Sequence, residues 1–85
     1  MTTIEFKDPK MAAIVAKVLT EIERAEIKHP NFADSIIDKC AIVCEEAGEL
    51  IRAGLQYKYE NGTIEDIETE AIQTACTAIR LLKNL

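Results

Sequence analysis

Residues 44–55 read CEEAGELIRAGL, and this stretch decides the fold that the sequence predicts. Its apolar side chains recur at the three- and four-residue spacing of one helix face, in a stripe that runs from Ile36 to Leu55. Glu45, Glu46 and Glu49 are crowded into the same turns. Carboxylates at these spacings are neighbours on a helix and repel one another by about 0.2–0.5 kcal/mol per pair. A helix with one apolar face therefore carries a cluster of like charges that needs either solvent or a cation.

A first helix is predicted before this stretch, from Asp8 to about Lys28. An aspartate followed by proline is a typical helix start, because the carboxylate caps free N–H groups and proline fits the first helical position. The pair His29–Pro30 ends this helix, since the residue before proline avoids helical angles. Either Asn31 or Asp34 is expected to cap the second helix.

A third helix is predicted from Thr63 to nearly the C-terminus, after a break at Asn61–Gly62. Asp66 stands three residues after Thr63, as in a capping box. Gly48 lies inside the second helix, where glycine costs about 1 kcal/mol relative to alanine, so close packing of another backbone or a ligand is expected there. We predict an all-α fold with one domain, residues 1–85, in which three antiparallel helices form a bundle that oligomerisation completes.

Composition excludes several classes of function. The chain has 85 residues, of which 48% are hydrophobic and 29% charged, as in globular proteins. A net charge of -5 argues against nucleic-acid binding, which needs clustered Lys and Arg. No apolar run is long enough to cross a membrane, and no secretory signal is evident at the N-terminus.

The cysteines indicate a reducing compartment, because an odd number of them occurs without a signal peptide, and we expect a cytoplasmic protein. Cys40 and Cys44 are four residues apart among apolar neighbours, so we interpret them as small buried hydrophobic residues. A zinc site is not expected, since His29 is the one histidine available to join them.

The acidic cluster has a counterpart on the third helix, where Glu70 and Gln73 are three residues apart. If the second and third helices are antiparallel, these side chains and those of Glu46 and Glu49 lie at similar heights. Oxygen ligands of this kind suit Mg²⁺, and carboxylates on facing helices are an established way to hold a metal. The alternative is that both pairs are ordinary solvated helix faces, and the pattern by itself leaves both readings open.

The stretch CEEAGELIRAGL resembles the EExxE helix of the MazG-like all-α nucleoside triphosphate pyrophosphohydrolases, which include small phage-encoded members. The later stretch ETEAIQTACTAIRLL, residues 68–82, resembles the helix that carries ExxD in that family. The resemblance covers about residues 20–83, and it departs from the family at Gln73, where the family has Asp. Glu65 and Glu68 provide a rival register for the second motif, which fits the flanking residues less well.

The resemblance implies a hydrolase that depends on Mg²⁺, or alternatively Mn²⁺, and cleaves nucleoside triphosphates between the α and β phosphates. Catalytic roles would fall to Glu45, Glu46 and Glu49. The same glutamates, together with Glu70 and Gln73, would be the metal ligands. A homodimer or homotetramer is expected. The competing hypothesis is a non-catalytic module that uses the same fold for oligomerisation or partner binding and has a weakened metal site.

Candidate substrate contacts are basic or aromatic side chains outside the acidic cluster. Those that could contact phosphate groups are Lys28, Lys39, Lys58 and Arg80, and those that could stack on a base are Tyr57 and Tyr59. Each of these also has an ordinary interpretation as a solvated surface residue, and for Arg80 that interpretation is an ion pair with an acidic neighbour.

Overall fold

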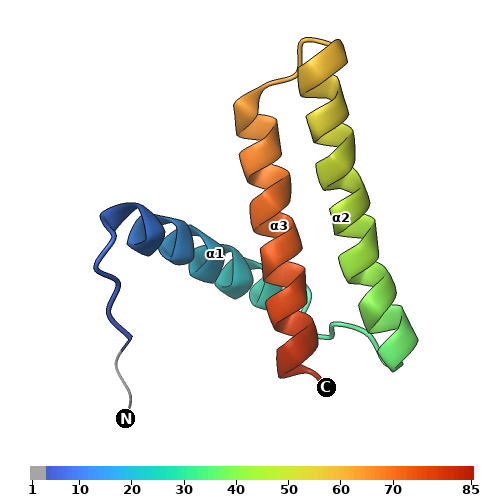
Figure 1. The fold of residues 1–85 in the computed structure, drawn as a ribbon. Coiled ribbons are helices and arrows are strands. Elements are labelled where there is room, and N and C mark those ends of the chain that lie inside the picture. The colour runs from blue at the N-terminus through green and yellow to red at the C-terminus, as the bar shows by residue number, and fades with distance from the viewer. Residues whose placement is uncertain (1–3) are drawn as a thin grey trace.

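The computed structural model describes residues 4–85, which contain three helices and no strand. Helix α1 spans Pro9–Lys28, α2 spans Ile36–Tyr59 and α3 spans Ile64–Lys83 (Figure 1). The all-helical class and the bounds of the first and third helices are as the sequence predicts. No helix in this described part combines the length and the apolar character that crossing a bilayer requires.

Polar side chains cap the start of every helix. The Asp8 carboxylate accepts a hydrogen bond from the backbone N–H of Lys10, and the Thr63 hydroxyl accepts one from Asp66. The cap of α2 is Ser35, whose hydroxyl accepts from the backbone N–H of Asp38, so the predicted caps Asn31 and Asp34 are wrong. A serine hydroxyl reaches the same free N–H groups from one residue further along, which the sequence could not distinguish.

The short α2–α3 turn depends on the backbone conformation of Asn61 and on the small size of Gly62. Asn61 adopts a left-handed conformation with φ 59°, which asparagine tolerates better than most residues. Gly62 donates its N–H to the carbonyl of Gln56, and a Cβ at this position would lie 2.8 Å from the backbone nitrogen of Tyr57. Glycine is therefore required by close approach of the backbone, and the turn sends α3 back along α2.

Helix α3 is the centre of the arrangement, because it packs against both α2 and α1 whereas α1 and α2 do not pack on each other. Figure 1 shows α2 and α3 as an antiparallel pair and α1 leaving that pair at a steep angle. The Cα radius of gyration is 14.4 Å, compared with about 12 Å for a compact domain of this length. A single chain therefore forms an open arrangement in which the bundle is not closed.

Few side chains of residues 4–85 are buried in this open arrangement. The buried residues are Ile22, Ala53, Cys76, Thr77 and Arg80. Cys76 is fully buried, whereas Cys40 is half-buried and Cys44 is exposed, so the expectation of burial is wrong for Cys44. No atom lies within 4 Å of a Cβ built on Gly48, so the close approach expected there does not occur within one chain.

Candidate functional site

Three glutamates face one another across the α2–α3 pair, and we call Glu46, Glu49 and Glu70 the acidic seam. Glu49 and Glu70 line the same cavity of about 260 Å³. Arg52 and Asp66 also line it, so this cavity holds carboxylates from both helices and one cation. The antiparallel turn therefore brings together side chains that are twenty-one residues apart in the sequence.

Glu46 of the acidic seam is partly buried and lies close to other charges. Partial burial raises the pKa of the Glu46 carboxyl, and the charges of Glu70, Glu45 and Glu49 raise it further, in that order. Glu70 lines one cavity together with Glu49 and Arg52 of α2, so its side chain lies on the side of α3 that faces α2. Such repulsion favours protonation of Glu46 or the arrival of a cation.

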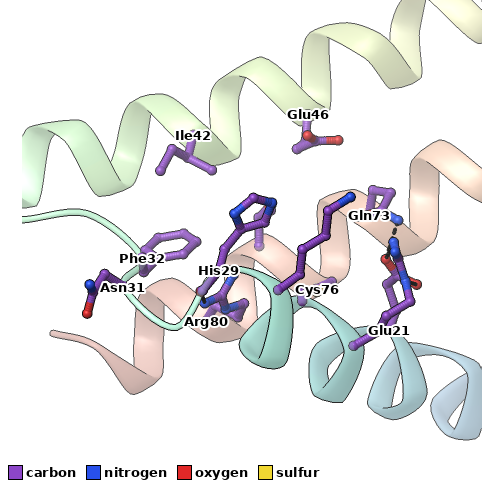
Figure 2. A pocket seen from close by; sticks show the side chains of 13 residues that line it. Glu21, His29, Asn31, Phe32, Ile42, Glu46, Gln73, Cys76 and Arg80 are labelled. Carbon is purple, nitrogen blue, oxygen red and sulfur yellow. Dashed lines mark hydrogen bonds and ion pairs between the residues drawn. The ribbon is translucent and has the colours of Figure 1, made fainter.

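Gln73 is tied to α1. Its Nε2 donates a hydrogen bond of 2.6 Å to Oε1 of Glu21, which also forms an ion pair with Arg24 (Figure 2). The hydrogen bond from Arg24 is the main reason why the pKa of Glu21 is lowered, and it outweighs the partial burial that acts in the opposite direction. Glu21 is thus a carboxylate whose charge is satisfied within the chain.

A second cavity, of about 370 Å³, lies between all three helices and the loop that joins α1 to α2, and we call it the inter-helix cavity. At one end Glu46 and Gln73 come from α2 and α3, next to Glu21 from α1 (Figure 2). At the other end Phe32 and Arg80 line it. Glu46, the member of the acidic seam that lines this cavity, therefore shares it with a cationic, aromatic end.

The predicted phosphate contacts separate into two groups. Lys28 and Arg80 both line the inter-helix cavity. Lys39 instead donates to the backbone carbonyl of Asn84, and Lys58 lies 5.2 Å from the centre of the Tyr59 ring near the far end of α2. Further residues that the sequence singled out are exposed, namely Glu45, Tyr57, Tyr59, Glu65 and Glu68.

Within residues 4–85, no three His, Cys, Asp or Glu side chains are grouped closely enough to hold a metal ion as they stand. The donor chemistry of the acidic seam nevertheless fits a hard cation, because all of its side-chain donors are carboxylate oxygens. None of these three carboxylates forms an ion pair within the described residues, where the ion pairs are Arg24–Glu21 and Lys83–Glu26.

Sequence reasoning missed Glu21, Phe32 and Asp66 as site residues. Glu21, Arg24 and Lys28 share one stripe of α1, since they are three and four residues apart, and this row of one acidic and two basic side chains was a usable signal. Nothing local indicated that this stripe would meet Gln73, which is 52 residues away. Asp66 was interpreted only as part of a helix cap.

Comparison of the chain with protein-family models, with curated proteins and with solved structures finds no match.

Proposed function

We propose that this protein is a Mg²⁺-dependent nucleoside triphosphate pyrophosphohydrolase with a MazG-like fold. Water would attack the α phosphorus and the bond from that phosphorus to the bridging oxygen would break, which releases a nucleoside monophosphate and pyrophosphate. The observation that carries the proposal is the convergence of Glu46, Glu49 and Glu70 from antiparallel helices without an ion pair among residues 4–85.

The unpaired carboxylates of the seam support a cation-dependent reaction. A bound divalent cation supplies charge neutralisation at the phosphate chain and a more acidic water. Glu46, Glu49 and Glu70 would hold it with one or two oxygens each. Glu45, which is exposed on the neighbouring position of α2, would orient the attacking water or bind a further ion.

Gln73 favours the competing proposal of a non-catalytic module. Its Nε2 donates a hydrogen bond to Glu21, and its Oε1, which is the atom able to bind a metal, carries no full charge. A seam with one carboxylate fewer binds Mg²⁺ more weakly. On this alternative the fold would serve oligomerisation or partner binding, and nucleotide would not be turned over.

We further propose that a second copy of the chain closes the bundle, as a homodimer or as a pair within a homotetramer. The accessible surface is 6658 Å², about 1,600 Å² more than a folded monomer of 9.5 kDa exposes. An excess of this size per chain is in the range that obligate homodimers bury. Ile37 and Ile51 on α2 and Leu19 on α1 are more than half exposed, which supports an apolar contact there. Sedimentation of a single 9.5 kDa species at micromolar concentration would contradict this.

The hydrolase proposal is tested by release of pyrophosphate from canonical and modified ribo- and deoxyribonucleoside triphosphates, with Mg²⁺ or Mn²⁺. We expect turnover of at least one substrate, and a loss of at least a hundredfold in kcat/KM for Glu49→Gln. Glu26→Gln is the matched control, because it removes the same charge from a half-exposed carboxylate on α1 that pairs with Lys83 and lines none of the cavities of the candidate site. No turnover of any substrate with either metal would exclude the enzyme and favour the non-catalytic module.

A further inference from the structure

The inter-helix cavity contains a buried cation without a counter-charge. Arg80 is only 6% exposed, and the described residues place no carboxylate within ion-pair distance of it. Arginine is seldom buried to this extent unless it is paired, because removing its charge from water is costly. The ordinary interpretation of Arg80, which was the alternative to a phosphate contact, is an ion pair with an acidic neighbour, and no such pair occurs among residues 4–85.

The hydrogen bonds of Arg80 are also incomplete. Its Nη2 donates to the backbone carbonyl of His29, while its buried Nε has no acceptor among residues 4–85. The guanidinium lies 5.1 Å from the centre of the Phe32 ring. The carboxylate that feels its charge, Glu26, is already bound by Lys83. A ligand that provides acceptor oxygens and negative charge would complete this site.

The rest of the cavity indicates which anion fits. Arg24, Lys28 and Arg80 line it together with two carboxylates, of which Glu21 is neutralised by Arg24. This lining is therefore cationic at the Arg80 end of a protein whose net charge is -5. A guanidinium pairs well with the oxygens of a phosphate, and Phe32 provides an apolar surface beside it. A volume of about 370 Å³ is at the lower end of ligand pockets.

We infer that the inter-helix cavity binds a small phosphate monoester, with its phosphate on the Arg80 guanidinium and its organic part along Phe32 and Ile42. The phosphate site lies at the end of the cavity opposite Glu46, which is the member of the acidic seam that lines the cavity, and Arg80 follows Gln73 by seven residues, or about 10 Å along α3. It needs no metal ion. The inference therefore stands or falls independently of hydrolysis.

The test is a titration of the full chain in EDTA with four nucleoside 5′-monophosphates, the four matching nucleosides and inorganic phosphate. Binding is followed by NMR at the Ile42 methyl groups and the Cys76 amide. We expect saturable binding of at least one monophosphate, tenfold or more weaker binding of its nucleoside, and weak binding of inorganic phosphate at the same residues. No saturable binding of any monophosphate overturns the inference, and so does equal binding of the nucleoside.

Two substitutions separate a binding role of Arg80 from a structural one. Arg80→Met should weaken monophosphate binding at least tenfold and leave the melting temperature unchanged or higher, because it removes an unpaired buried charge. Lys10→Met removes the same charge from an exposed position outside the cavity, where Lys10 has no ion pair among residues 4–85, and should leave binding unchanged. A lower melting temperature with unchanged affinity in Arg80→Met would assign Arg80 to stability alone.

Arg80→Lys covers the case in which Arg80→Met does not fold. It keeps the charge and loses the planar fork, so binding should be several-fold weaker with the fold intact. Affinity equal to the wild type in that variant would overturn the guanidinium contact. Glu49→Gln should bind the monophosphate as tightly as the wild type in EDTA, because Glu49 does not line the inter-helix cavity. Failure of the hydrolase proposal would abolish pyrophosphate release and leave this binding in place, whereas failure of the present inference would abolish the binding.

Discussion

Glu21 of α1 and Glu46 of the acidic seam lie in opposite electrostatic surroundings. Glu21 on α1 accepts hydrogen bonds from Arg24 and Gln73, and these lower its pKa. Glu46 across the same end of the cavity is partly buried among other carboxylates, which raises its pKa. The negative charge of Glu21 is thus compensated within the chain, whereas that of Glu46 has no ion-pair partner among residues 4–85.

This difference separates carboxylates that stabilise the fold from carboxylates that are available to bind a cation. A carboxylate with partners in its own chain contributes to stability and gains little from an added cation. Carboxylates that repel one another cost stability until a cation arrives. The predictions below test this contrast between Glu21 and the acidic seam.

The largest effect is expected from Mg²⁺ acting on the acidic seam. An ion that binds only the folded protein, present at a hundred times its dissociation constant, stabilises by about 2.7 kcal/mol, which corresponds to a shift on the order of 10 °C in a domain of this size. Glu49→Gln should remove most of this shift, and Glu21→Gln should leave it in place. Thermal melting with and without Mg²⁺ measures both, and an unchanged wild-type melting temperature would contradict the prediction.

An intermediate effect is expected from Glu21→Gln, which should lower the free energy of unfolding at pH 7 by about 1 kcal/mol. The folded-state pKa of Glu21 lies below its ordinary value of 4.5, so its contribution is present above that pH and is lost as pH falls through the lowered pKa. Urea denaturation at pH 7 and at about pH 3 should show the difference between variant and wild type shrinking. A difference that stays constant with pH would mean that the charge of Glu21 is not responsible.

The smallest effect, of opposite sign, is expected from Glu46→Gln without metal. Removal of this charge should raise the free energy of unfolding at pH 7 by about 0.5 kcal/mol, because it relieves repulsion in the seam. The pKa of Glu46 is raised above 4.5, so the gain should disappear as pH falls below that value, where wild-type Glu46 is itself protonated. Glu45→Gln at the exposed neighbouring position should show a smaller gain, and destabilisation by Glu46→Gln at pH 7 would contradict the contrast.

Much of the local structure could be predicted from the sequence. The start of α1 at Asp8, the end near Lys28 and the cap at Thr63 depend on neighbouring residues, and the structure confirms them. The sequence also predicts that Glu70 faces α2, because Glu70 and Gln73 share one face of their helix and a short turn makes the two helices antiparallel. The cap of α2 was predicted at Asn31 or Asp34 but is Ser35, because the cap depends on where the chain turns. Cys44 was predicted to be buried but is exposed, because burial depends on what packs against the helix.

The sequence by itself determined the helices, the caps of α1 and α3 and the spacing that sets Glu46 and Glu49 on one side of α2, since these depend on contacts within a few residues. Only the tertiary structure decided that α1 packs on α3 and not on α2, that Glu21 meets Gln73, and that Arg80 is buried with no carboxylate of residues 4–85 in ion-pair distance. The physical reason is that helix docking depends on the shape and charge of whole faces, which no local pattern encodes.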